Sequence, residues 1–80
     1  MSTYYLIEKD SRKKGMYINN EQVYRLNGEE IKQVLTRPRI DGEWRKPHLP
    51  VVYPKDVLEN YGYRELSEEE VAMLMFEATS

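Results

Sequence analysis

The chain contains no cysteine among its 80 residues. This absence excludes a disulfide framework, thiol catalysis and zinc sites with cysteine ligands. The single histidine, His48, lies between two prolines without a second ligand on a helix, so we interpret it as an ordinary loop residue and not as a metal ligand. The sequence also lacks a glycine-rich phosphate loop and a serine nucleophile elbow. We therefore expect a protein that is not an enzyme and that holds no cofactor and no metal.

Long apolar runs are missing as well. No segment approaches the roughly 18 apolar residues that a membrane-spanning helix needs. The start of the chain, MSTYYLIEKD, lacks the basic and then apolar pattern of a secretory signal. We therefore expect no contact with a membrane and a cytoplasmic location, with which the absence of cysteine is compatible.

The length of the chain fits one domain, residues 1–80, without room for a second core. Its net charge of −2 hides an asymmetry, because residues 1–55 carry 11 Lys and Arg against 7 Asp and Glu, while residues 56–80 carry 1 against 7. The first part is therefore net +4 and the second part net −6. Two interpretations remain open: the two parts attract each other within one fold, or the charge steers a contact with a partner.

The strongest helix signal covers residues 67–78, SEEEVAMLMFEA. Ser67 is a predicted N-cap with Glu70 three residues later, which is the pattern of a capping box. Three successive glutamates then lie at the positive end of the helix dipole. A core-facing stripe about 100° wide is predicted for four apolar residues, which are Val71, Leu74, Met75 and Ala78.

The same helix has apolar residues outside that stripe. Phe76 extends it, and Met73 lies nearly opposite its centre, so the apolar surface is wider than one small sheet can cover. Either the domain covers this helix on two sides, or Met73 and Phe76 contact another chain, which is a protein partner or a second copy forming a homodimer.

Upstream of this helix the pattern predicts a small antiparallel sheet. Three short strands are expected at residues 3–9, 16–18 and 23–26, where β-forming residues alternate between turn signals. The first strand has apolar residues on both of its faces, so we expect it to be covered on both sides.

Two shorter helices are also predicted. The first begins at Asn27, a predicted N-cap with Glu30 in its first turn, and ends near Thr36 or Arg37, before Pro38. The second begins at Pro54 and ends at a left-handed cap on Gly62. Residues 63–66 form a connector or an edge strand. The predicted fold class is therefore α+β, with about three strands, a short hairpin, two short helices and a C-terminal helix.

The segment 37–48, RPRIDGEWRKPH, combines the single tryptophan with four Lys and Arg residues, a combination that folding alone does not require. Asp41 and Gly42 predict a two-residue hairpin turn. In that register four side chains share one face, namely Arg37, Arg39, Trp44 and Lys46. Arg45 lies on the other face with Ile40 and Glu43.

This hairpin has three interpretations. Trp44 stacks on an unpaired base while the cations meet phosphates; or the residues contact an acidic protein surface; or Arg39 stacks on Trp44 and the other charges are solvated. A second cationic cluster occurs in the predicted first turn, where we interpret it as a solvated loop: Lys9, Arg12, Lys13 and Lys14.

The sequence resembles no family specifically enough to transfer residues from it. Our hypothesis is a small protein-binding module that regulates, inhibits or assembles a larger partner, as accessory proteins of phages and plasmids of this size do. The alternative is a nucleic-acid-binding protein that uses the hairpin 37–48, although a sequence pI near 5.4 counts against it. A homodimer through the C-terminal helix is compatible with both.

Overall fold

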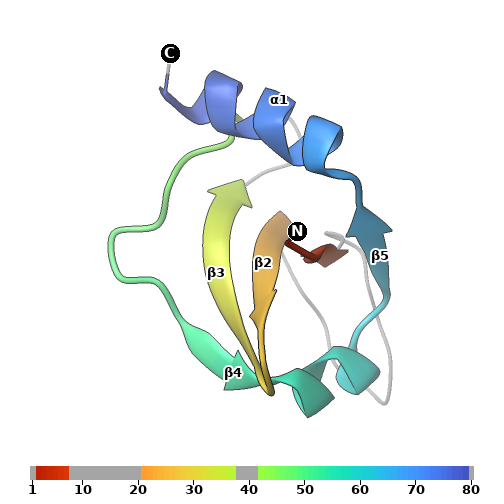
Figure 1. The fold of residues 1–80 in the computed structure, drawn as a ribbon. Helices are drawn as coiled ribbons and strands as arrows, with labels where there is room; N and C mark the ends of the chain where they lie inside the picture. Colours follow the sequence, from red (N-terminus) through yellow and green to blue (C-terminus); the bar gives the residue numbers. More distant parts are fainter. Residues whose placement is uncertain (1, 8–20, 38–41, 80) are drawn as a thin grey trace.

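The computed structural model of the protein describes residues 2–7, 21–37 and 42–79. Its elements follow one another as β1 (Tyr4–Ile7), β2 (Glu21–Asn27), β3 (Glu30–Arg37), β4 (Val52–Pro54), the 3₁₀ helix η1 (Lys55–Asn60), β5 (Tyr63–Leu66) and α1 (Glu68–Thr79). The strands form one antiparallel sheet in the order β4-β3-β2-β1-β5 (Figure 1). The α+β class is confirmed, although the sheet has five strands where three and a hairpin were predicted.

Both faces of this sheet are covered, because neighbouring residues of one strand point to opposite sides. One buried cluster, here called the α1-side cluster, consists of Leu6, Val23, Leu35, Trp44, Leu66 and Val71. The other, here called the η1-side cluster, consists of Ile7, Tyr24, Ile31 and Leu58. Leu6 and Ile7 of β1 thus serve different clusters, which confirms that the first strand is covered on both sides.

An irregularity in the pairing of β2 with β3 lets β3 serve both clusters. Val23 pairs with Leu35, whereas the next residue, Tyr24, pairs with Gln33. Val34 is therefore an additional residue on β3, as in a β-bulge. Because of this shift, Ile31 and Leu35 belong to opposite clusters, although residues four positions apart in a regular strand point to the same side.

The two helices lie at opposite ends of the sheet (Figure 1). α1 crosses the end at which β3 finishes, and η1 lies at the other end, between β4 and β5. The predicted core stripe of α1 is confirmed, since Val71 is buried in the α1-side cluster and three partly buried residues pack against it, Leu74, Met75 and Ala78. No helix in the described ranges is long and apolar enough to cross a membrane.

The helix predicted from Asn27 to Thr36 is wrong, because this segment is strand β3. Asn27 pairs with Glu30 across a two-residue turn, and Gly28 in that turn has φ of +65°. That conformation suits glycine and a hairpin. The asparagine and glutamate that resembled a helix cap are therefore a cross-strand pair, and β-branched residues such as Ile31 pack well in the strand between two neighbours.

The helix predicted from Pro54 is a 3₁₀ helix. It ends at Tyr61, whose backbone is extended and whose N–H donates to the Leu58 carbonyl, and not at a left-handed cap on Gly62. Strand β4 was not predicted, and residues 63–66, predicted as a connector or an edge strand, form the edge strand β5. The strand predicted at 16–18 lies outside the described residues, and so do the 9–14 cationic cluster and the Asp41 position of the predicted hairpin turn.

Candidate functional site

A groove of about 350 Å³ lies between α1 and the α1 side of the sheet. Its apolar lining comes from β1, β5 and α1, which contribute Leu6, Leu66 and Leu74. These side chains meet because β1 and β5 are neighbouring strands and α1 follows β5 directly. Trp44 and Met73 complete the apolar part, and two ion pairs, Glu21 with Arg37 and Arg64 with Glu70, complete the lining.

Trp44 enters the site through the pairing of its neighbour with the end of β3. The backbone groups of Arg45 and Thr36 exchange two hydrogen bonds of 2.9 Å. This bridge brings the segment that follows the predicted hairpin turn alongside β3, and it places the Trp44 ring over the α1-side cluster. The indole is only 6% exposed, so it is part of the core.

The ion pair between Glu21 and Arg37 closes one side of the groove. The two residues are cross-strand partners on β2 and β3, and their side chains are 13% and 21% exposed. The Arg37 guanidinium carbon also lies 5.1 Å from the centroid of the Trp44 ring, within the range of a cation–π contact. Arg37 therefore covers the ring and neutralises the carboxylate, and both contacts tie the end of β3 to the site.

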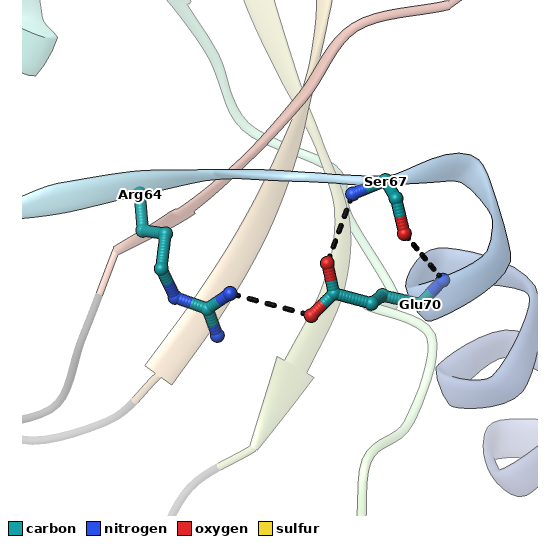
Figure 2. A network of polar contacts seen from close by, with 3 residues as sticks. All are labelled: Arg64, Ser67 and Glu70. Atoms are coloured by element: carbon teal, nitrogen blue, oxygen red, sulfur yellow. Dashed lines mark hydrogen bonds and ion pairs between the residues drawn. The ribbon is translucent and has the colours of Figure 1, made fainter.

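The other side of the groove is fixed by the start of α1 (Figure 2). The Ser67 hydroxyl accepts a hydrogen bond from the Glu70 N–H, and the Glu70 carboxylate accepts one from the Ser67 N–H, both at 3.1 Å. The predicted capping box is therefore confirmed. Arg64 of β5 donates to the other Glu70 oxygen at 3.3 Å. The Ser67 N–H, and after it Arg64, hold the pKa of Glu70 below its ordinary value, so this carboxylate is charged at neutral pH.

Beyond the groove, α1 turns large apolar side chains toward solvent. Met73 is 75% exposed and Phe76 is 76% exposed. They lie three residues apart, so they are neighbours on the helix surface. Met73 also lines the groove, and therefore the exposed face of α1 and the groove form one continuous surface.

The structure brings together some of the predicted binding residues and separates others. Arg37 and Trp44 meet in the groove, whereas Arg45 and Lys46 are exposed outside its lining. Arg39 lies outside the described residues, so its predicted contact with Trp44 does too. Thr36 pairs with Arg45, whereas a two-residue turn at Asp41 and Gly42 would pair Arg45 with Pro38, so the predicted register is wrong.

The sequence reasoning missed the part of the groove that the sheet supplies. Leu6, Arg64 and Leu66 were placed in strands without any role at a site. Along β5 only Leu66 is buried, and Tyr63, Arg64 and Glu65 are exposed, so the strand has no alternating pattern of burial. The residues of such a strand cannot show which strand lies beside it, so the sequence contained no signal for the groove.

A second, smaller cavity of about 80 Å³ lies on the η1 side, where three of its six lining residues are tyrosines. The buried Tyr24 hydroxyl donates a hydrogen bond to the Gln22 side-chain oxygen. Burial, and then the neighbouring Tyr53 and Tyr61, raise the pKa of Tyr24 well above its ordinary value. The phenol therefore stays neutral at physiological pH, and we assign it a packing role.

Within the described part of the chain, no group of three or more His, Cys, Asp or Glu side chains lies close enough to hold a metal ion. The groove presents an apolar lining, paired charges and a neighbouring apolar helix face. Such a surface suits contact with another molecule through apolar burial and charge. No protein-family model matches this chain, and neither a curated protein nor a solved structure is significantly similar to it.

Proposed function

We propose that this protein is a small protein-binding module without catalytic activity, which regulates, inhibits or assembles a larger partner by covering part of its surface. The observation that carries the proposal is the exposure of Met73 and Phe76 on α1, at 75% and 76%, beside the groove. Burying each of these side chains in an interface contributes about 1.5–3 kcal/mol. Within the ranges that the structure describes nothing covers them, so we attribute that stabilisation to a partner.

The segment around strand β4 also exposes apolar side chains, since Leu49 and Val51 before the strand are 85% and 37% exposed, and Val52 and Tyr53 within it are 49% and 39% exposed. Its backbone is poorly suited to pairing with a partner strand. The backbone N–H of Gln33 donates to the Val51 carbonyl, and the backbone N–H of Lys55 donates to the Glu29 carbonyl. The backbone polar groups of residues 51, 53 and 55 therefore point toward β3, and those of residues 50, 52 and 54 point away from the sheet.

Residues 50 and 54 are prolines, which have no N–H to donate. Of the three outward positions, only Val52 therefore offers a donor to an added strand. Prolines at such positions protect a sheet edge from pairing. This protection favours α1 over β4 as the contact surface.

The nucleic-acid alternative loses its central element in this conformation. Trp44 is 6% exposed and Arg37 covers its ring, so the indole offers no open face to a base. Arg45 and Lys46 remain exposed and are able to meet phosphates. Two cations on a chain with pI near 5.4 form a much smaller footprint than nucleic-acid-binding domains present.

The proposal is tested with the double variant M73S/F76S and a matched control, R45S/K46S, which changes two exposed residues of the alternative site. Both variants are expected to keep the circular dichroism and melting curve of the wild type. Protein captured from a native lysate by each variant is compared quantitatively with capture by the wild type. We expect M73S/F76S to lose specific partners that R45S/K46S retains.

Equal capture by all three proteins would contradict the proposal. Salt-sensitive nucleic acid retained by the wild type and by M73S/F76S but lost by R45S/K46S would favour the alternative. Both capture experiments assume a cytoplasmic partner. We place the protein in the cytoplasm because a chain without cysteine cannot form the disulfides that an oxidising compartment supports.

A further inference from the structure

The small cavity on the η1 side of the sheet is lined by a cluster of aromatic side chains. Three tyrosines from separate parts of the fold border its volume of about 80 Å³, namely Tyr24 of β2, Tyr53 of β4 and Tyr61, the C-cap of η1. The ring centroids of Tyr24 and Tyr53 are 6.1 Å apart, and the ring planes are tilted by 50°. Because these tyrosines come from different elements, only the fold brings them together around one cavity.

The cavity has a buried floor and an accessible rim. Ile7 and Tyr24 are buried, whereas Tyr53 is exposed and Tyr61 is partly exposed. The volume is larger than the roughly 10–15 Å³ that one water molecule needs, and smaller than the roughly 300–1,000 Å³ of pockets that enclose a whole ligand. Only the end of a ligand, or of a partner's side chain, therefore fits.

The polar atoms and rings at this cavity favour a cation over an anion. The Tyr24 hydroxyl donates its hydrogen to the Gln22 side-chain oxygen, so it offers lone pairs and no proton to a ligand. The face of an aromatic ring is negative, and it attracts a cation that lies within about 6 Å of the ring centroid. Three rings around one small volume therefore stabilise a cation better than an anion.

The charges around η1 have the sign that attracts a cation. A second depression that borders η1, of about 290 Å³, is lined by the exposed carboxylates of Glu29, Asp56 and Glu59 and by one cation, Lys55. Among the described residues, these three carboxylates take part in no ion pair. Asp56 directly precedes Val57, which lines the cavity, and neighbouring Cα atoms are about 3.8 Å apart. This separation is well inside the screening length of about 8 Å at physiological ionic strength, so the negative charge acts on a group in the cavity.

An alkylated ammonium suits this cavity better than a bare one. Ile7 and Val57 add apolar surface to the lining. A lysine ammonium is strongly hydrated and has three N–H donors, each of which needs an acceptor after it leaves water. A methylated ammonium has the same charge with fewer donors, and aromatic side chains around a cavity recognise such groups. The lining therefore selects for alkyl groups on the cation.

We infer that the cavity binds an alkylated ammonium group, which belongs to a choline-type small molecule or to a methylated lysine of a protein. Tyr24, which packs in the η1-side cluster, forms the floor of the site, and Tyr53 and Tyr61 form its rim. The inference goes beyond the proposed function, because η1 and α1 lie at opposite ends of the sheet (Figure 1).

The test compares choline with its neutral analogue, in which a tert-butyl group replaces the trimethylammonium group. Both are titrated into the full wild-type chain, and the ring resonances of the tyrosines are followed by NMR. A glycine–serine peptide with one trimethyllysine and the same peptide with unmodified lysine form the second pair of probes. Both comparisons use the wild type, so they do not depend on the folding of a variant.

We expect choline to bind at least about tenfold more tightly than the neutral analogue, and to shift the resonances of the three cavity tyrosines most. Tyr53→Leu and Tyr61→Leu should each weaken choline binding by about two- to fivefold. Tyr63→Leu is the matched control, because it removes an exposed tyrosine outside the cavity, and it should leave binding unchanged. D56N/E59Q should reduce the salt dependence of binding. Circular dichroism of each variant verifies folding.

Equal binding of choline and its neutral analogue would overturn the inference, and so would equal binding of the two peptides or the absence of shifts at millimolar choline. Tighter binding of the trimethyllysine peptide than of choline would assign the cation to a modified protein, and the reverse order would assign it to a small molecule. None of these outcomes involves Met73 or Phe76, so failure of this inference is distinguishable from failure of the proposed function.

Discussion

Replacement of Trp44 by alanine tests directly whether this residue belongs to the core or to an open binding surface. The side chain is 6% exposed and packs with five other buried residues of the α1-side cluster. Truncation of a buried tryptophan to alanine typically costs about 3–5 kcal/mol. The whole stability expected for 80 residues is about 4–12 kcal/mol. The variant Trp44→Ala should therefore lose a large part of its stability.

The measurement is urea unfolding followed by circular dichroism, which does not depend on the indole. With a slope of about 2 kcal/mol per M, a loss of about 4 kcal/mol lowers the unfolding midpoint by about 2 M. Met73→Ala is the control, because Met73 is 75% exposed and a surface substitution changes stability by about 0.5 kcal/mol or less. A loss below about 1 kcal/mol in Trp44→Ala would refute the placement of the ring in the core.

Further substitutions at three sites test the local structure. Gly28→Ala should destabilise the β2–β3 hairpin by about 1–2 kcal/mol, because φ of Gly28 is +65°, although an added Cβ would meet no atom within 4 Å. Gly28→Asn should lower the melting temperature less, because asparagine adopts this conformation more readily. Equal melting temperatures of the two variants would contradict this reasoning. Ser67→Ala should cost about 1 kcal/mol of unfolding free energy in urea. The Ser67 N–H lowers the pKa of the Glu70 carboxyl in the folded protein below its ordinary value of about 4.5. The stabilisation by the charged Glu70 is therefore present above that pH and is lost as the pH falls through the lower folded pKa. Glu70→Gln should flatten this part of the stability–pH curve, and an unchanged curve would exclude the contribution. Arg37→Leu should cost about 1–3 kcal/mol by leaving the Glu21 carboxylate partly buried without its cation, and a second change, Glu21→Leu, should recover part of the loss in a double-mutant cycle.

Local signals were sufficient for the C-terminal part of the fold. The capping box of Ser67 and Glu70 and the core stripe of α1 were predicted and are observed, and residues 63–66, predicted as a connector or an edge strand, form a strand. Each depends on residues within a few positions of one another. The two-sided burial of β1 was predicted for the same reason, because consecutive apolar residues in a strand need cover on both faces.

Tertiary contacts decided the elements that the local patterns left ambiguous. The apolar spacing of Ile31, Val34 and Leu35 fits a helix, yet pairing with β2 on one side and β4 on the other selects the strand. Local pattern could not show that Trp44 and Arg37 would meet under α1, because that contact depends on how the chain between β3 and β4 returns to the sheet.

The sequence by itself determined the α+β class, the helix that ends the chain, and the charge difference between residues 1–55 and 56–80. The tertiary structure alone decided which apolar side chains become core and which stay exposed. Trp44 and Phe76 are both large aromatic residues, yet one is 6% exposed and the other 76%. The difference arises because Trp44 packs in the α1-side cluster, whereas Phe76 lies on the side of α1 that faces solvent, and both placements depend on contacts between residues far apart in the chain.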